Sequence, residues 1–554
     1  MKKHATDLSE VRQHIARHLD LDTLKSCSLV CKTWHLDFHP VLWELFTCKV
    51  PKQCSESPEK YATWMDITSQ KAHLFRHIYD GKTRGPMPPE IRDIVLRCHR
   101  LITIEVSVAE NEYSDPIHYW EETLRPFIER SKVSLQRLLL REVTPVSMTS
   151  LQLPGLLAGL PRLRSLELEI GSTMEDVFPI LEACLTSLEC LDLRILRSKP
   201  KRSLVNQNDS ATDQHNSPSQ SLVHREATNS TPLRLKHLSV HGICYDGALK
   251  DILSHVAIHS LESLQVNAVV DDQFFLLMSP ALNDTLSRLT ELNIRSLHPD
   301  HLSAFLMFLI AIPPHQLRKT NTGPMDTECV DMLIQKQHQS LESLIGTFQW
   351  GHTRALGDIL ATCHKLKNLD FRAERLIDIR TLIDPQRPWV CTELEVFEGH
   401  FGLPPPLHSL ASNENDDKQD GQEEDYEKVA TTDQVESLFL ERLGRLTKLR
   451  RLAQGYEVVR YFYTMETDNE NVMAWTLSSG LRHLTDLVNL RWLEFYDEDL
   501  PPSIGIPELM FIKRHWVNLQ GLGCNKIDAA EVKEWLATEW PELEVKLKHG
   551  SLEK

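Results

Sequence analysis

The sequence predicts an α/β solenoid, in which short parallel strands form an inner sheet and helices cover its outer side. Three observations support this fold class. The spacing Leu-x-x-Leu-x-Leu recurs along the chain, neighbouring copies mostly lie 25–28 residues apart, and segments with a helical apolar period separate them. One strand and one helix cannot bury their own apolar faces, whereas stacked units can, so the pattern favours a repeat array.

The strands are justified by the leucine spacing. Its copies begin at Leu135, Leu163, Leu188, Leu235, Leu261, Leu289, Leu341, Leu366, Leu394, Leu449, Leu490 and Leu519. The fourth and sixth positions, such as Leu166 and Leu168, point to the same face of a strand and enter one core. The step of 52 residues from 289 to 341 fits two units with a degenerate copy near Leu317. This spacing and period are typical of leucine-rich repeats.

The helices are expected between the strands. Helix-period segments lie at 174–185, 246–259, 301–312, 354–366 and 434–446. The alternative is a set of Rossmann-like βαβ domains, but no glycine-rich phosphate loop follows any strand. The asparagine or cysteine that many leucine-rich repeats place after the strand is absent, so we expect irregular turns and an irregular horseshoe. The equivalent positions hold Gly171, Leu196, Ile243, Val269 and Leu297.

Composition and charge exclude several classes of function. The chain has 554 residues, 41% of them hydrophobic, and a formal net charge of -17, which argues against a nucleic-acid binder. No run of about 18 apolar residues predicts a membrane span. The start, MKKHATDLSEV, lacks the apolar run of a signal peptide, and the 12 cysteines form no CxxC pair. We therefore expect an intracellular protein, cytoplasmic and/or nuclear, with reduced thiols.

Two polar stretches interrupt the repeats. Residues 198–232 are rich in Ser, Asn and Gln and are expected to be a disordered insertion. Residues 404–432 form a second one, within which 413–428 hold eight acidic and two basic residues, a net charge of -6. This acidic loop is a solvated spacer or a specific acidic docking site.

Residues 8–46 predict three short helices. Val11, Ile15 and Leu19 form an apolar stripe after a Ser9 N-cap. A second stripe holds Leu24, Cys27, Val30, Cys31 and Trp34, and a third helix begins at Pro40. Some 40 residues are too few for an independent core, yet they are strongly apolar. The leader is therefore expected to bury one face in its own bundle and another against a partner, or else to cap the solenoid.

This leader resembles an F-box. The resemblance rests on Leu8-x-Glu10-Val11, on CSLVCKTW ending at Trp34, and on Leu42-Trp43, with Ser9 where the family usually has proline. An F-box followed by leucine-rich repeats resembles the substrate receptors of cullin-RING ubiquitin ligases. The resemblance implies binding to a Skp-family adaptor and, through it, to a cullin and a RING protein. The implied adaptor-binding and packing positions are Leu8, Ser9, Ile15, Leu19, Leu21, Leu24, Leu29, Val30 and Trp34, with Trp34 and Trp43 as the aromatic anchors.

The expected domain order follows from these patterns. We expect an F-box at 6–48, a helical linker or cap at 49–100, and the leucine-rich-repeat solenoid at 101–545. Side chains between the strand leucines would line the concave face and bind an unknown protein substrate. The candidates are Glu167, Asp192, Arg194, His241, Asn293, Arg295, Asp370, Arg372, Trp492 and Tyr496.

No pattern predicts catalysis, a cofactor or a metal. Cys27, Cys31 and His35 share a helical spacing, but a fourth zinc ligand is missing, so buried thiols are the simpler interpretation. The sequence contains no GxSxG, GxxxxGK[ST] or HExxH motif. We expect a non-catalytic subunit of a ubiquitin ligase, and the alternative is a leucine-rich-repeat scaffold without a role in ubiquitination.

Overall fold

The structure is a computed structural model that divides into two compact units near β8, with unit 1 covering residues 1–261 and 265–269 and unit 2 covering 262–264 and 270–554. Each unit is described by itself. The described residues are 9–47, 57–79, 89–107, 124–143, 152–171, 177–184, 187–195, 232–242, 252–253, 255–267, 270, 272–278, 286–295, 297–348, 353–373, 377–403, 432–455, 473, 475–495, 504–524, 527 and 529–547.

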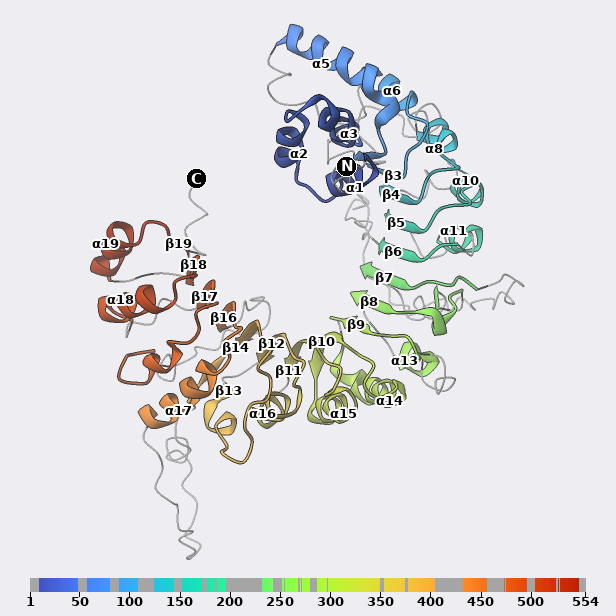
Figure 1. Ribbon diagram of the computed structural model, residues 1–554. Coiled ribbons are helices and arrows are strands. Elements are labelled where there is room, and N and C mark those ends of the chain that lie inside the picture. Colours follow the sequence, from blue (N-terminus) through green and yellow to red (C-terminus); the bar gives the residue numbers. More distant parts are fainter. Residues whose placement is uncertain are drawn as a thin grey trace, which may run out of the picture. The chain divides into compact units, whose positions relative to one another are not determined.

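Unit 1 is a ladder of parallel strands with helices on one side (Figure 1). Its strands are β1 (Leu45–Thr47), β2 (His77–Tyr79), β3 (Thr103–Ser107), β4 (Arg137–Val143), β5 (Ser165–Ile170), β6 (Cys190–Ile195) and β7 (His237–Gly242), together with residues 265–267 of β8 (Ser263–Asn267). The helices between them are α5 (Pro58–Lys71), α6 (Pro89–Leu96), α8 (Arg125–Arg130), α10 (Leu153–Ala158) and α11 (Phe178–Ala183).

The strand leucines build the core as predicted. In β5 the burial alternates along the strand, so that Leu166 and Leu168 are fully buried while Glu167 between them stays partly exposed. Neighbouring strands pair these positions in register, Leu166 with Leu191 and Leu168 with Leu193. Because equivalent leucines stack from strand to strand, each unit completes the core of its neighbours.

Unit 2 repeats the same arrangement. Its strands are β9 (Glu291–Ile294), β10 (Lys319–Met325), β11 (Ser343–Phe348), β12 (Asn368–Ala373), β14 (Val396–Gly399), β16 (Arg451–Gln454), β17 (Trp492–Phe495), β18 (Gly521–Cys524) and β19 (Glu544–Leu547), with β13 (Ile377–Asp378) and β15 (Phe401–Gly402) paired apart. The helices are α13 (Asp272–Met278), α14 (Leu302–Ala311), α15 (Thr327–Gln337), α16 (Thr353–Thr362), α17 (Thr432–Gly444), α18 (Ile506–His515) and α19 (Ala530–Glu539).

The degenerate repeat expected near Leu317 is confirmed. Strand β10 follows Leu317 and pairs with β9 and β11 on its two sides. Its register shifts between Thr322 and Pro324, where Gly323 lies so close to β9 that a side chain would clash with the Arg295 carbonyl. The leucine spacing is weak here because the buried Thr320 and Thr322 stand at the positions that pair with Leu292 and Ile294 of β9.

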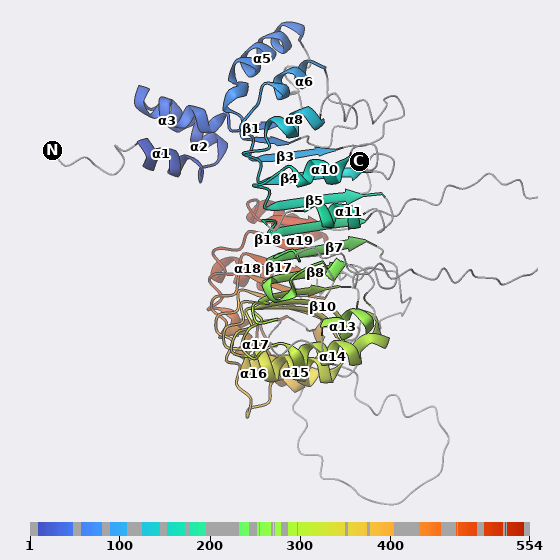
Figure 2. The same cartoon turned by 90° about the vertical axis from the view of Figure 1, so that its right-hand side faces the viewer.

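The N-terminal residues form three helices, α1 (Ser9–Ala16), α2 (Leu21–Ser28) and α3 (Lys32–Leu42), which lie together to one side of the first strands (Figure 2). Ala16, Leu24 and Phe38 make the buried core of this bundle. The helix bounds differ from the predicted ones. The chain breaks between Ser28 and Lys32 where one long helix was expected, and Pro40 lies inside α3 instead of starting a helix.

The sheet begins earlier than the predicted solenoid boundary at residue 101. Strand β1 pairs in parallel with β2, and β2 with β3, so the expected linker at 49–100 contributes a strand and two helices to the repeat array. The leucine spacing did not predict the strand β2, because its sequence is His-Ile-Tyr and Ile78 is its one buried residue. Almost all of the expected insertions at 198–232 and 404–432 lies outside the described residues.

Candidate binding surfaces

The helical bundle exposes a set of apolar side chains. Leu29 is 83% exposed, Val30 and Leu36 are each 64% exposed, and Ile15 is 40% exposed. Leu29 and Val30 lie in the turn after α2, which ends at Ser28, and Leu36 lies on the outer side of α3. These exposed apolar side chains make the bundle a candidate binding surface.

The other predicted adaptor-binding residues pack within the bundle. Leu24 is buried in its core, Leu19 and Trp34 pack against that core, and the Trp34 ring stacks on Phe38 at 5.1 Å between centroids. Leu8 and the side chain of Leu21 lie outside the described residues.

Trp43 joins the bundle to the first strands. Its indole Nε1 donates to His39 Nε2 at 3.1 Å, and its ring lies 6.3 Å from that of Phe75, just before β2. Trp43 is half-buried in this position. The predicted aromatic anchors, Trp34 and Trp43, therefore contribute to packing within unit 1.

A buried ion pair connects α1 to α3. The apolar stripe of residues 8–46 did not predict this pair. Arg12 donates to the Asp37 carboxylate through Nε and Nη2, both at 2.6 Å, and Ser9 Oγ donates to the same carboxylate. These hydrogen bonds, first that of Ser9 and then those of Arg12, outweigh the effect of burial and lower the pKa of Asp37. The face of α1 that points inward thus carries Arg12 and Ala16, whereas Val11 is half-buried and Ile15 is exposed.

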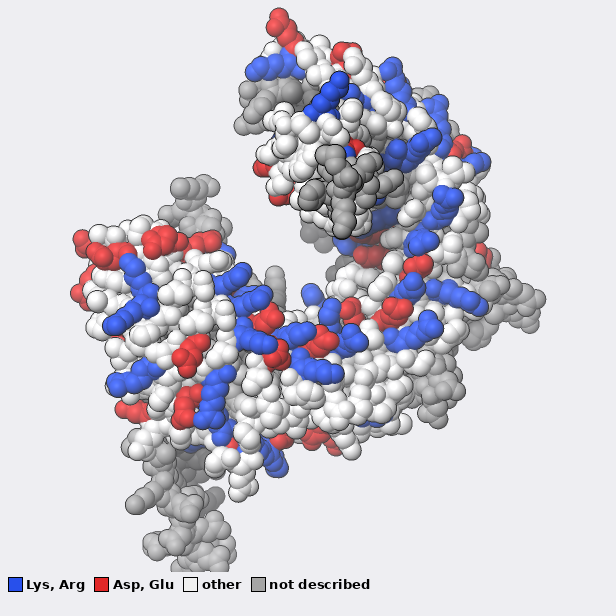
Figure 3. All heavy atoms as spheres, viewed as in Figure 1, with Lys and Arg blue, Asp and Glu red and all other residues white. Residues whose placement is uncertain are grey.

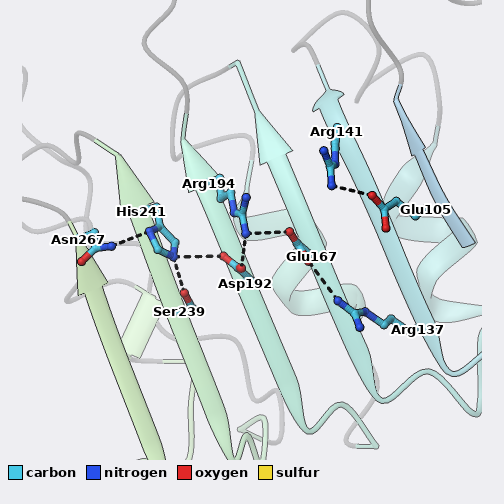
Figure 4. A network of polar contacts seen from close by, with 9 residues as sticks. All are labelled: Glu105, Arg137, Arg141, Glu167, Asp192, Arg194, Ser239, His241 and Asn267. Carbon is cyan, nitrogen blue, oxygen red and sulfur yellow. Dashed lines mark hydrogen bonds and ion pairs between the residues drawn. The ribbon is translucent and has the colours of Figure 1, made fainter. Parts of the chain in front are cut away.

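The concave candidates of unit 1 lie side by side in one polar network (Figure 4). Arg194 Nη2 contacts Glu167 at 3.0 Å and Asp192 at 3.3 Å, and Arg137 contacts Glu167 from the other side at 3.6 Å. Strands β4, β5 and β6 supply these groups in register. Sequence patterns predicted Glu167, Asp192 and Arg194, and the structure adds Arg137.

His241 continues this network towards β8. Its Nε2 lies 2.7 Å from Ser239 Oγ and 3.8 Å from Asp192 Oδ1, and its Nδ1 lies 2.9 Å from Asn267 Nδ2. Three polar atoms of this network are buried without a hydrogen-bond partner in the described structure. They are Arg194 Nε, Asp192 Oδ1 and Asn267 Oδ1. Burial lowers the pKa of Arg194, but Asp192, Glu167 and Glu169 outweigh that effect and raise it, so the guanidinium stays charged.

Among the predicted residues of unit 2, Trp492 is packed against its neighbours. Trp492 lies over Gly521, where an added Cβ would be 2.0 Å from Cζ3 of the indole, and Lys546 Nζ sits 3.9 Å from the ring centroid. On the neighbouring strand Arg451 contacts Glu398 at 3.3 Å and Glu494 at 2.8 Å. These contacts hold the ring of Trp492 and the guanidinium of Arg451 in fixed positions.

The remaining predicted residues of unit 2 are dispersed. Asp370 on β12 is buried, Asn293 on β9 is half-buried, and Arg295 just after β9 is exposed. Tyr496 and the side chain of Arg372 lie outside the described residues.

The described residues hold no group of three or more His, Cys, Asp or Glu side chains that could bind a metal ion. Burial raises the pKa of the Cys98, Cys184 and Cys391 thiols to about 12, so these cysteines are protonated and unreactive at neutral pH. No helix in the described part of the chain is long and apolar enough to cross a membrane.

No family model and no curated protein matches this sequence. Among solved structures, a leucine-rich-repeat protein of Leptospira interrogans is 13% identical, with 87% of this chain and 98% of that chain covered and a TM-score of 0.34. The leucine-rich-repeat-containing protein LegL7 from Legionella pneumophila is 10% identical, with 69% and 97% covered and a TM-score of 0.26. The repeat fold is seen in this chain's own leucine spacing and strand register.

Proposed function

We propose that this protein is the substrate receptor of a Skp-cullin-F-box ubiquitin ligase. In this proposal the bundle α1–α3 binds a Skp-family adaptor, and the strand-lined face of the repeats holds a target protein. In this proposal the protein acts without a catalytic group of its own, by keeping the target close to the ubiquitin that a conjugating enzyme brings to the ligase.

The observation that carries the proposal is the exposed apolar surface of Leu29, Val30, Leu36 and Ile15. Two of these, Leu29 and Val30, stand in the CSLVCKTW motif on which the resemblance to an F-box rests. A leader that merely capped the solenoid would turn its apolar side chains towards the sheet. Here Leu24 and Phe38 lie in a small core with Leu19 and Trp34 packed against it, while Leu29, Val30 and Leu36 are exposed.

The test is co-purification of the full chain with a Skp-family adaptor. We expect the wild-type protein to form a stable complex and a Leu29→Asp/Leu36→Asp variant to lose it. Burying one leucine at an interface contributes about 1.5–3 kcal/mol, so each substitution is expected to weaken binding by about tenfold or more. Leu24→Asp is unsuitable, because Leu24 lies in the core and its loss would unfold the bundle.

Val133→Asp and Val517→Asp are the matched controls, since both valines are at least 60% exposed but lie on the repeats. They are expected to leave the complex intact. The docking proposal is wrong if wild-type protein forms no complex, or if the leucine variant binds as tightly as these controls.

The alternative function is a leucine-rich-repeat scaffold that binds proteins without any role in ubiquitination. The polar network of unit 1, in which buried atoms lack hydrogen-bond partners, is compatible with either function. A ligase receptor requires that the abundance of its target rise in cells carrying the Leu29→Asp/Leu36→Asp variant, whereas a scaffold leaves target abundance unchanged.

A further inference from the structure

The residues beside the start of each strand make one edge of unit 1 basic. This strand-entry edge consists of the positions one before, one after and two after the first buried leucine of the repeats that hold β3–β7. Its fifteen positions carry one acidic residue, Glu189, and six basic residues, which are Arg100, Arg137, Arg162, Arg164, Arg234 and Lys236. In Figure 3 this edge of unit 1 faces the viewer, and basic side chains recur along it. The edge is therefore positive, although the whole chain has a formal net charge of -17.

Three of these basic residues are not paired. Arg100, Arg162 and Arg234 are exposed, and within the described residues their side chains form no hydrogen bond or ion pair. The other three basic residues each contact a carboxylate of unit 1. The three unpaired guanidiniums thus keep their N–H donors available for another molecule.

The unpaired arginines alternate with serines at the same position of the repeat. The arginines stand directly before the first buried leucine in the repeats of β3, β5 and β7. The repeats of β4, β6 and β8 carry serines there, which are Ser134, Ser187 and Ser260. Each serine Oγ donates to the carbonyl of the first leucine of the preceding repeat, at 2.8, 3.3 and 2.7 Å. The serines therefore join neighbouring repeats, whereas the arginines make no such contact.

This alternation sets the distance between the unpaired arginines. Strand β4 pairs with β3 and β5, and β6 pairs with β5 and β7, so consecutive arginines are two strands apart. Neighbouring strands lie about 4.8 Å apart, which places the arginine backbones at steps of about 9.6 Å. A polyproline II peptide has three residues per turn and rises about 3.1 Å per residue, so every third side chain lies on one side at steps of about 9.3 Å. The two periods match.

From this arrangement we infer that the strand-entry edge of unit 1 binds an extended acidic segment of a partner protein, with an acidic side chain at every third residue. Each carboxylate meets one guanidinium, whose planar set of N–H donors fits a carboxylate. A DNA strand has a phosphate about every 3.4 Å along the helix axis, so three arginines at this spacing would leave most phosphates without a partner. The inference goes beyond the proposed function, because it concerns a different surface and holds for a receptor and for a scaffold.

Fluorescence anisotropy of a labelled fifteen-residue Glu-Pro-Pro repeat peptide with the full chain tests the inference. Arg100→Gln, Arg162→Gln and Arg234→Gln are each expected to weaken binding about two- to fivefold, as for an exposed charge pair. The triple variant is expected to bind more weakly than any single variant. An isomeric peptide with all its glutamates in one block is expected to bind the wild-type protein more weakly than the repeat peptide, because the block is too short to reach all three arginines.

Arg354→Gln is the matched control, because Arg354 is exposed, forms no ion pair within the described residues and lies on α16 of unit 2. It is expected to leave binding unchanged. The inference is overturned if the triple variant binds as tightly as this control, if the block isomer binds as tightly as the repeat peptide, or if a fifteen-nucleotide oligothymidylate binds more tightly than the repeat peptide. The assay contains no adaptor, so its failure is distinguishable from failure of the ligase proposal.

Discussion

Replacement of Asp37 by alanine is expected to unfold the N-terminal bundle while the repeats stay folded. Asp37 holds Arg12 through two contacts of 2.6 Å, and the two side chains are only 8% and 7% exposed. Without Asp37 the guanidinium would be buried without its carboxylate, and Ser9 Oγ would lose its acceptor. Breaking a buried pair from one side costs about 3–5 kcal/mol.

That loss is comparable to the whole stability available to a bundle of this size. Its fully buried apolar core comprises Ala16, Leu24 and Phe38, and small cores rarely supply more than about 3–5 kcal/mol. Hydrogen exchange followed by mass spectrometry would locate the effect. Amides of α1–α3 are expected to lose protection in Asp37→Ala, whereas amides of β5 and β6 keep theirs.

The control is Asp22→Ala, since Asp22 is 92% exposed and pairs with Lys25 at the surface of α2. This change is expected to alter stability by less than about 1 kcal/mol. The reasoning is refuted if Asp37→Ala and Asp22→Ala show the same protection. Because the folded bundle lowers the pKa of Asp37, its stabilising effect is present above the ordinary aspartate pKa and is lost as the pH falls towards the lowered value.

Two further predictions concern the repeats and the cysteines. Gly521→Ala is expected to destabilise unit 2 by about 1–3 kcal/mol, because the new methyl group would displace the Trp492 ring. Thermal unfolding measures this loss. The control is Gly155→Ala, where no atom lies within 4 Å of the new methyl group, and equal melting temperatures of the two variants would contradict the prediction. Cys31 is expected to react with a thiol reagent in the native protein before Cys98, because Cys31 is exposed while burial raises the pKa of Cys98 to about 12. Peptide mapping of the modified chain measures the order of reaction. Equal labelling of the two cysteines would contradict the prediction.

The repeat architecture was predictable because it follows from side-chain period alone. Leucines at the fourth and sixth positions must share a face, and Leu166 and Leu168 do so. The repeat that contains Ile78 lacks that spacing and was not predicted, because only one residue of its three-residue strand is buried. The degenerate unit near Leu317 was found only through the spacing of its neighbours.

The bundle was harder to predict because its packing does not follow a single apolar stripe. An ion pair replaces apolar contact on the inner face of α1, so Ile15 turns outward and Arg12 turns inward. The sequence also cannot show which of two charged side chains stands outermost on a sheet. That order, seen at Arg194 over Glu167, depends on cross-strand register and side-chain length.

We propose that a Skp-family adaptor completes the N-terminal bundle. Hydrogen exchange of the full chain with and without saturating adaptor tests it most directly. New protection is expected around the turn from Leu29 to Cys31 and along α3, with no change in the strands of unit 2. Unchanged exchange throughout the bundle at saturating adaptor would contradict binding of the adaptor to this bundle.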